Sequence, residues 1–235
     1  MITGIIIALP NELTTLTSKR IDRGHCVFIA DKILVAYSGA GATNAQISAE
    51  LLISKGTNQL ISWGCAAALD GTLKPGDLVI ADRLITRDDE YIEVNKRWHA
   101  HAHSLLSPLL TTFIGGLTES ASIVSSNKEK QHLHTITQAI ALDMESAAIA
   151  KTAQEKNLPF LTIRVIVDPA TMNMPAAINY AINDHGEISL KKLALFIALH
   201  PNELIDLIRL GFYFNAAKSS LKQVAKKIDA LSHFQ

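Results

Sequence analysis

Apolar residues occur along this chain in short runs that polar or glycine-containing turns interrupt. Residues 2–9 and 160–167 form unbroken runs rich in isoleucine, valine and leucine, a pattern typical of strands buried on both faces of a sheet. Residues 26–30 and 33–37 flank Asp31-Lys32 and predict a β-hairpin. Shorter runs predict further strands at residues 60–63, 78–81, 91–94, 121–125 and 139–142.

Helices are predicted between these strands. Residues 44–55 read as a helix that Gly56 ends, and the alanine-rich segment from Glu145 begins another. Further helices are predicted after Pro10, at residues 105–114, from Lys128, and after Pro175 almost to the end with a restart at Pro201. Strands that alternate with helices predict an α/β fold with a mixed or parallel sheet covered on both faces.

The overall composition limits the classes of function. Acidic and basic residues balance at 22 each among 235 residues, so the chain lacks the electrostatic footprint of a nucleic-acid-binding protein. Charged residues make up 19%, below the usual ~25%, and apolar residues 48%, which predicts hidden surface and a subunit interface. Cys26 and Cys65 form no C-x-x-C or zinc pattern, and the N-terminus does not read as a secretory signal. We therefore expect a cytoplasmic protein without a membrane-spanning helix.

Several polar residues lie just after predicted strands, where an α/β sheet offers its ligand crevice. They are Glu12, Ser38, Cys65, Glu145 and Asp168. Each could be an ordinary loop residue, but together they predict a composite pocket at one edge of the sheet.

Residues 139–150, AIALDMESAAIA, carry the most informative group. A short strand ends at Asp143, and a helix begins almost at once at Glu145. A carboxylate can accept hydrogen bonds from both hydroxyls of a ribose cis-diol, and Met144 offers an apolar surface to a sugar ring. The alternative is that Glu145 only faces the helix dipole as a first-turn acid.

The order of five motifs resembles the purine nucleoside phosphorylase/hydrolase superfamily. The motifs are GIIIALPNEL, SGAGATNA, WGCAAALDGTLKPGDLVIAD, LDMESAAIA and LPFLTIRVIVDPA. The chain is most similar to the nucleosidases that release adenine from thio- and deoxy-adenosines. It is closer still to the hopanoid-associated phosphorylases, through DMES, RVIVDPA and HPNELIDLIRL.

The resemblance covers roughly residues 1–212. It implies one domain over residues 1–235, with a mixed, partly barrel-like central sheet flanked by helices. The C-terminal helices, at about residues 187–235, are expected to pack on that domain.

The resemblance also implies a role for each matching residue. Glu12 matches the glutamate that orients and activates the attacking water, and Glu145 the glutamate that binds the ribose hydroxyls. Met144 matches the methionine packed against the sugar, and Asp168 the aspartate that hydrogen-bonds or protonates adenine N7. The remaining substrate-binding residues predicted here are Ser38, Gly39, Cys65, Ala66 and Asp143. No metal or other cofactor is implied.

The chemistry of N-glycosidic cleavage fits these carboxylates independently. Breaking the bond builds positive charge on the sugar and negative charge on the base, so an acid at N7 and a positioned water can each contribute ~10²–10⁴ in rate. Asp168 can donate only if a dry pocket holds it neutral, while Glu12 must stay ionised. The alternatives are an Asp-Pro turn at Asp168 and a surface helix acid at Glu12.

Water is the favoured acceptor. Phosphate, with roughly two negative charges, favours arginine, but Glu12 and Trp63 lie in the loops where the superfamily's bacterial phosphorylases carry arginines. A carboxylate at Glu12 would repel phosphate. Backbone amides of residues 38–41 could still form an anion nest, so phosphate is the alternative co-substrate.

Residues 98–103 hold a tryptophan and three alternating histidines. His99, His101 and His103 would share one face of a strand, but no carboxylate pattern accompanies them, so a metal site is disfavoured. The resemblance makes Trp98 a candidate wall of the pocket for the 5′ substituent. A neighbouring subunit supplies that wall in the related nucleosidases, which implies a homodimer.

The terminal helix repeats apolar residues at helical spacing. These residues are Leu221, Val224, Ala225, Ile228 and Leu231. An amphipathic helix packed on the domain is favoured, and peripheral membrane contact is the alternative.

The leading hypothesis is therefore an adenine-releasing nucleosidase, whose substrate the resemblance implies to be adenosine carried on a hopane skeleton. A purine nucleoside phosphorylase is the second reading. A non-catalytic nucleoside-binding or membrane-docking protein is the third, because the chain departs from the nucleosidase pattern at Cys65, at Val167 and at residues 126–129.

Overall fold

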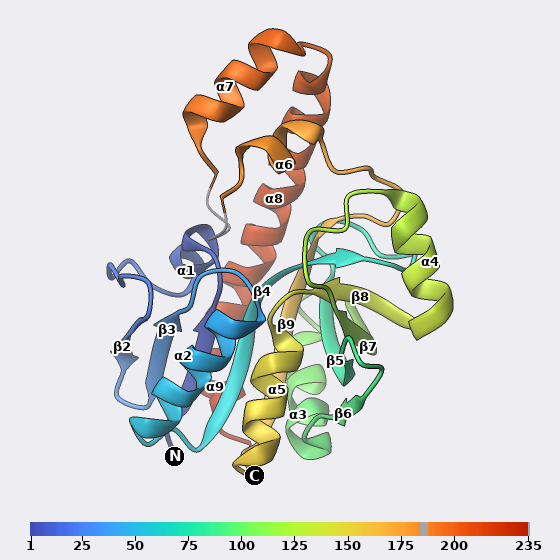
Figure 1. The fold of residues 1–235 in the computed structure, drawn as a ribbon. Coiled ribbons are helices and arrows are strands. Elements are labelled where there is room, and N and C mark those ends of the chain that lie inside the picture. Colours follow the sequence, from blue (N-terminus) through green and yellow to red (C-terminus); the bar gives the residue numbers. More distant parts are fainter. Residues whose placement is uncertain (184–187, 235) are drawn as a thin grey trace.

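The computed structural model describes residues 1–183 and 188–234. In this part of the chain nine strands form one mixed sheet, with helices around it and a helical projection that stands away from it (Figure 1). The predicted α/β fold with a mixed, partly barrel-like sheet is confirmed.

Five strands close on one another. They are β4 (Gln59–Ala68), β5 (Leu78–Ile85), β7 (Thr112–Glu119), β8 (Ala139–Asp143) and β9 (Phe160–Asp168). In order around the ring, β4 pairs with β8, β8 with β7, β7 with β5, β5 with β9, and β9 again with β4. The closed ring explains how residues far apart in sequence reach one place.

The other strands extend the sheet. β1 (Thr3–Ile7) pairs in parallel with β4 and with β3 (Ile33–Tyr37), and β2 (His25–Ala30) pairs antiparallel with β3 as the predicted hairpin. Short β6 (Tyr91–Glu93) pairs with β5.

The apolar runs are buried on both sheet faces, as predicted. On β1, Ile6 belongs to the core cluster under α2 (Ala42–Ser54) and α5 (Ser146–Glu155). Its neighbours Ile5 and Ile7 belong to the opposite cluster. That second cluster lies under α1 (Pro10–Leu16), α3 (Lys96–Leu106), α8 (Glu203–Ala225) and α9 (Ile228–Ser232). The alternation of side chains along a strand produces this division.

Two predicted elements between residues 96 and 125 are wrong. The predicted helix at residues 105–114 lies instead at α3, which starts where the Asn95 side chain accepts from the Trp98 N–H. The predicted strand at residues 121–125 is a loop, and the strand is β7, which includes Gly115 and Gly116. A Cβ on Gly115 would lie 2.9 Å from Ile140, so tertiary packing explains a glycine pair that weakens the local strand signal.

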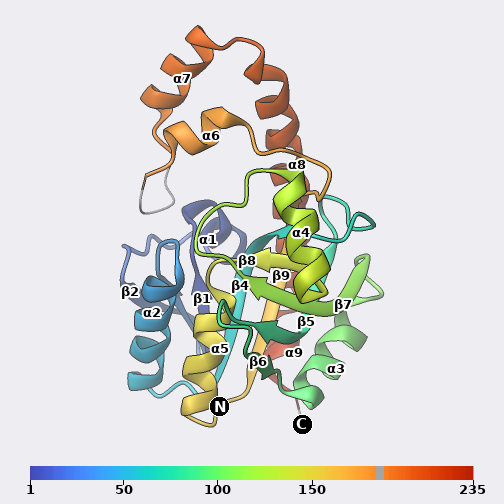
Figure 2. The same cartoon turned by 45° about the vertical axis from the view of Figure 1, so that its right-hand side comes forward.

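The C-terminal segment divides into a packed and a projecting part. On the last turns of α8 and on α9, Leu221, Val224 and Leu231 are fully buried, as a helix face packed on the domain requires. α6 (Ala176–Ala181), α7 (Leu190–Leu199) and the start of α8 form the projection (Figures 1 and 2). The predicted helical run after Pro175 includes residues 184–187, which lie outside the described residues.

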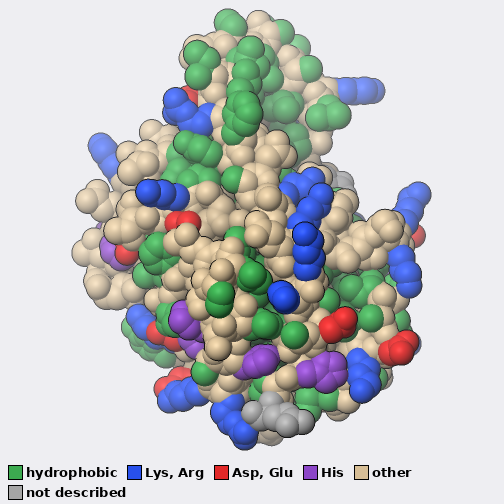
Figure 3. All heavy atoms as spheres, turned by 180° about the vertical axis from the view of Figure 1, so that it is seen from behind, with side chains coloured by type: hydrophobic (Ala, Val, Ile, Leu, Met, Phe, Trp, Pro, Cys, Tyr) green, Lys and Arg blue, Asp and Glu red, His purple; other side chains and the backbone are tan. Residues whose placement is uncertain are grey.

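Seen from behind, the projection carries exposed apolar side chains (Figure 3). On α7, Leu195 and Leu199 are 55% and 69% exposed, and on α8 Ile205 and Phe212 are 68% and 69% exposed. No helix in the described ranges is long and apolar enough to cross a membrane.

Candidate active site

The site is built around the middle of β4, where a glycine gives space to two charged groups. Gly64 lies opposite Arg164 in the β4–β9 register. A Cβ on Gly64 would lie 2.6 Å from Glu12 Oε1 and 2.7 Å from Arg164 Nη1. The absence of a side chain at Gly64 therefore lets the carboxylate and the guanidinium approach the strand.

Glu12 is buried and firmly held. It lies in the first turn of α1, directly after β1, with 2% of its surface exposed. The Cys65 N–H donates to Oε1 (2.7 Å) and the Leu9 N–H to Oε2 (3.1 Å). Burial raises the pKa of Glu12, while Arg164 and the two N–H groups oppose the rise. The surface-acid alternative is therefore wrong, and Glu12 is a candidate base with an elevated pKa.

Arg164 is a central residue that the sequence analysis missed. It is 1% exposed, and its Nε lies 2.6 Å from Asp143 Oδ2. The guanidinium also donates to Ser146 Oγ (3.1 Å), Ser62 Oγ (2.7 Å) and the Cys65 carbonyl oxygen (3.2 Å). An arginine inside the apolar run FLTIRVIV was the available signal, because a buried charge must be paired.

Asp143 forms an ion pair with Arg164. Its Oδ1 accepts from the N–H groups of Glu145 (3.3 Å) and Ser146 (3.1 Å), and its Oδ2 from the Ser146 hydroxyl and Arg164. Both oxygens are therefore occupied. The structure does not support the prediction that Asp143 binds substrate, because neither carboxylate oxygen has a free acceptor position.

Glu145 keeps more freedom. Its Oε1 accepts from the Gly41 N–H (2.8 Å), and its Oε2 lies 3.7 Å from Arg164 Nη2. Burial raises the pKa of Glu145 to about 7; Arg164 opposes the rise, and Asp143 and Glu12 add to it. The neighbouring Met144 is half-buried. A buried carboxylate and an apolar side chain are thus adjacent at the start of α5, and their contact with a sugar stays a prediction.

The turn after β3 forms the next side of the site. The Ser38 hydroxyl donates to the carbonyl oxygens of Ile7 (3.1 Å) and Gly39 (2.7 Å). Gly39 has φ 81°, and a Cβ there would lie 2.8 Å from Arg23 Cδ. Ser38 and Gly39 therefore shape the turn, and the Ser38 hydroxyl hydrogen is already used in hydrogen bonds within it.

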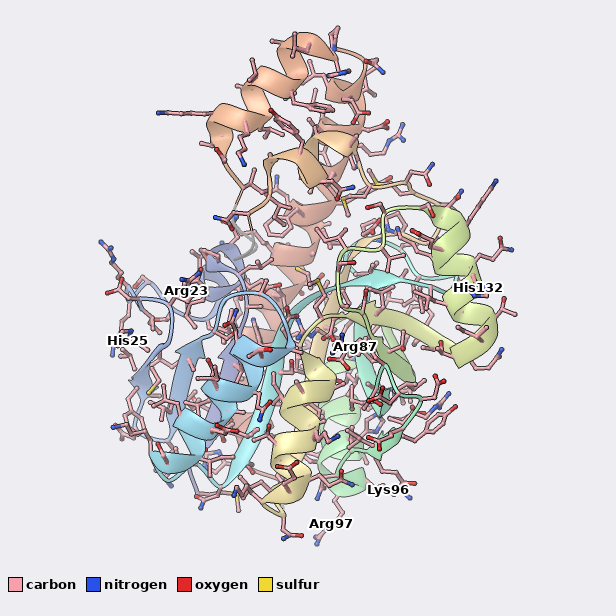
Figure 4. The ribbon with its side chains drawn as sticks, in the orientation of Figure 1. Arg23, His25, Arg87, Lys96, Arg97 and His132 are labelled. Atoms are coloured by element: carbon pink, nitrogen blue, oxygen red, sulfur yellow. The ribbon has the colours of Figure 1, made fainter. Side chains whose placement is uncertain are left out.

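A cavity of about 270 Å³ lies beside this turn. Its lining residues are Ala40, Gly41, Ala42, Thr43, Asn44, Arg87, Glu119, Ser120 and Ala121. Arg87 is at the centre of the view in Figure 4, with Nε 3.7 Å from Glu119 Oε2. The Gly41 N–H that holds Glu145 belongs to this lining, so the cavity adjoins the carboxylate cluster.

Cys65 and Ala66 follow Gly64 on β4. Burial and the Glu12 carboxylate raise the pKa of the Cys65 thiol well above its usual value. The thiol therefore stays protonated beside the Glu12 carboxylate. Ala66 is 4% exposed and belongs to the core.

Asp168 ends β9 and pairs with a lysine that the sequence analysis missed. Lys130 Nζ lies 2.6 Å from Asp168 Oδ1, and both side chains are buried. Residues 126–129 explain why Lys130 lies there. The Ser126 hydroxyl accepts from the Glu129 N–H, and the Glu129 carboxylate receives the Ser126 N–H, a capping box that starts α4 (Asn127–Thr137).

Trp98 does not lie in the site. It is fully buried, its Nε1 donates to the Leu231 carbonyl oxygen (2.7 Å), and its ring stacks on Phe234. The prediction that Trp98 forms a wall of the 5′ pocket is corrected, because the side chain packs from α3 against α9 and Phe234.

The predicted histidine face on a strand is also corrected. His99, His101 and His103 lie on α3, where the first two face the carbonyl oxygens of Ile80 and Ala230. Among residues 1–183 and 188–234, no group of three or more His, Cys, Asp or Glu side chains is placed to hold a metal ion.

Comparison with known proteins agrees with this architecture. The family described as the phosphorylase superfamily matches residues 3–195. A 5′-methylthioadenosine/S-adenosylhomocysteine nucleosidase of Staphylococcus epidermidis is 27% identical over 234 residues, 87% of this chain and 97% of that protein. A nucleosidase of the same name from Staphylococcus aureus (strain Newman) is 30% identical over 198 residues, 71% of this chain and 86% of that protein.

Solved structures show the same fold. The nucleosidase from Helicobacter pylori with butyl-thio-DADMe-Immucillin-A has a TM-score of 0.72 at 20% identity, covering 98% of this chain and 97% of that one. The nucleosidase from S. pneumoniae with the transition-state inhibitor MT-ImmA has a TM-score of 0.66 at 28% identity, covering 82% of this chain and 96% of that one. Given the match to residues 3–195 and a relative at 30% identity, the chain belongs to the phosphorylase superfamily.

Proposed function

We propose that this protein is an enzyme that hydrolyses the N-glycosidic bond of an adenine nucleoside and releases adenine. The observation that carries the proposal is the buried Glu12 carboxylate, fixed by two backbone N–H groups and placed with Arg164 beside Gly64. The names of the Staphylococcus relatives, both nucleosidases, support it.

In this proposal each carboxylate has a separate task. Glu12 takes a proton from the attacking water, and its raised pKa makes the carboxylate a stronger base than an ordinary glutamate. Glu145 accepts hydrogen bonds from the ribose hydroxyls, and Met144 lies against the sugar. Asp168 gives a proton to the departing adenine.

Water is preferred over phosphate because Arg164, the cation beside Gly64, is already engaged. Arg164 is committed to Asp143, Ser62, Ser146 and the Cys65 carbonyl oxygen. Two of the four amides in the suggested anion nest are also taken, because Ser38 N–H donates to Ile7 and Gly41 N–H to Glu145. Phosphorolysis is the second candidate, since the family is named for that reaction.

The finer proposal for the substrate is an adenosine whose 5′ carbon carries a hopane skeleton. Its support is the likeness of DMES, RVIVDPA and HPNELIDLIRL to the hopanoid-associated branch. The names of the Staphylococcus relatives instead indicate small thio-substituents on that carbon. A panel of adenosines with different 5′ groups separates the two.

Adenine release with and without phosphate tests the reaction. We expect release from adenine nucleosides in phosphate-free buffer, and we expect Glu12→Gln to abolish it while nucleoside binding changes little. Ser18→Ala, outside the site, serves as the matched control. Full activity of Glu12→Gln that depends strictly on added phosphate would establish phosphorolysis. Binding without any adenine release would identify a non-catalytic nucleoside-binding protein.

We further propose that this single-domain, cytoplasmic protein is a homodimer that buries the apolar faces of α7 and α8. Leu195 and Leu199 are one turn apart on α7, and Ile205, Ile208 and Phe212 share a face of α8. Exposed apolar clusters of this kind mark interfaces, and a second copy offers the same face in return.

Peripheral membrane contact is the weaker alternative for this face. The charges nearby are mixed, with Lys191 and Lys192 on α7 and Asp206 and Arg209 on α8. A helix that binds a membrane surface usually carries a predominantly basic polar face.

A further inference from the structure

A buried lysine lies against the proposed general acid. Lys130 has no exposed surface, and its Nζ lies 2.6 Å from Asp168 Oδ1. It also donates to the carbonyl oxygens of Pro169 (3.1 Å) and Met172 (2.9 Å). An ammonium has three N–H donors, which these three acceptors match. Lys130 is therefore held as a cation that faces one oxygen of Asp168.

The other oxygen of Asp168 is left for a ligand. Oδ2 has no hydrogen-bond partner within the part of the chain that the structure describes, although the side chain is only 3% exposed. An oxygen in that position can carry a proton to a base or accept one from it. Lys130 thus engages one of the two oxygens, and the other has no partner among the described residues.

Burial and the cation act on Asp168 in opposite directions. Burial raises the pKa of Asp168, and the Lys130 ammonium lowers it. Burial favours the protonated carboxyl group of Asp168. Once the proton has left, the carboxylate is in contact with the Lys130 ammonium. An interaction accelerates a reaction when it is stronger in the transition state than in the ground state. An interaction that stabilises both states equally does not.

We propose that Lys130 is a positioning residue that holds Oδ1 of Asp168 and stabilises the carboxylate formed when Asp168 protonates the departing adenine. This inference rests on the proposed function. The proton on Oδ2 passes to N7 as the C1′–N9 bond breaks, and the bonding electron pair stays with the base. Water bonds to C1′ and loses its proton to Glu12. Lys130 keeps its three protons throughout.

The pH profile of kcat for adenine release tests this role. In Lys130→Met we expect the plateau to fall by ~10- to ~10²-fold because the acid becomes weaker. We also expect the alkaline limb to move to higher pH, because Asp168 without the cation keeps its proton longer. Lys130→Arg retains the charge and should leave the limb near its wild-type position. Lys128→Met, on the exposed side of α4, is the matched control.

A purely structural role gives a different result. Lost packing would lower the melting temperature and kcat without moving the alkaline limb, and an unmoved limb in folded Lys130→Met would overturn the inference. Lys130→Gln replaces the methionine variant if the latter does not fold. Nucleosides with an activated leaving group should lose less activity than adenosine, and equal losses would also count against it.

A titration without turnover separates this inference from the proposed function. A wild-type protein that releases no adenine would refute the function alone. Carbon-13 NMR of the Asp168 carboxyl group should then still show a higher pKa in Lys130→Met than in the wild type. Identical titrations would refute the role of Lys130 whatever the activity.

Discussion

At the scale of single residues, the site is a chain of charges that are individually costly to bury. Arg164 links Asp143 and Glu145, and the same guanidinium lowers the pKa of Glu12 against the effect of burial. A buried charge is tolerated only when its hydrogen bonds are complete, which explains the dense contacts of Asp143 and Arg164. Glu145 is the member whose carboxylate retains capacity for a ligand.

Glu145 should make stability depend on pH. Its folded pKa of about 7 lies above the ordinary 4.5, so its contribution to stability is present at low pH and is lost as pH rises through about 7. Glu145→Gln removes this titration and should gain up to about 3 kcal/mol relative to the wild type between pH 4.5 and pH 8. Chemical denaturation across that range measures it.

The matched control for this prediction is Glu155→Gln, on the exposed end of the same helix. If the difference in unfolding free energy between wild type and Glu145→Gln stays constant with pH, the pKa of Glu145 is not raised by folding. The same variant should bind a 2′,3′-diol nucleoside more weakly, because one acceptor oxygen becomes a donor.

At the scale of elements, β4 positions the site because it pairs with β1, β8 and β9. Gly64 lies opposite Arg164 on β9, and Ala67 lies opposite Leu142, the residue before Asp143. α1 then adds Glu12 and α4 adds Lys130. No single element carries the site, so its geometry depends on strand register.

Gly64→Ala should therefore disrupt the site. The new Cβ would lie 2.6 Å from Glu12 Oε1 and 2.7 Å from Arg164 Nη1, so one of the two groups must move. We expect a loss of ~1–3 kcal/mol in the free energy of unfolding and a fall of about 10²-fold in adenine release.

Gly71→Ala is the control for that change, because a Cβ there meets no atom within 4 Å. Denaturant unfolding and steady-state kinetics on both variants provide the comparison. Wild-type kinetics in Gly64→Ala would mean that the positions of Glu12 and Arg164 matter little to the reaction.

At the scale of the whole molecule, the closed barrel and the projection have different surfaces. The strands of the barrel are largely buried, whereas α7 has no buried residue among those described. An apolar helix pair that stays exposed on one copy can be covered by another copy. The projection is therefore the region where assembly should be decided.

Charged substitutions on that face should separate the copies. Leu199→Asp and Ile205→Asp would each place a charge in the proposed interface, and we expect light scattering to report half the wild-type mass. Ile136→Asp, at a similarly exposed position on α4, should leave the mass unchanged. A monomeric wild type that binds lipid vesicles, and loses that binding in the same variants, would instead assign the face to a membrane.

The sequence by itself determined the general architecture. The apolar side chains at residues 2–9 and 160–167 are removed from water only in a sheet covered on both faces. The structure has β1 and β9 there. Glu12, Glu145 and Asp168 could be singled out because each lies at or just after the end of a strand within a recognisable motif. These signals are local, since they depend on residue types and short spacings.

Only the tertiary structure decided how the charges are paired. Lys130 reaches Asp168 across 38 positions and Glu145 reaches Gly41 across 104. The strand order β3-β1-β4-β8 brings Gly41 to Glu145, and the pairing of β4 with both β8 and β9 brings Lys130 to Asp168. Trp98, adjacent to no such junction, is buried elsewhere. A buried charge needs an opposite charge or a set of hydrogen bonds. The sequence does not show which residue provides them, because the partner depends on strand order and register.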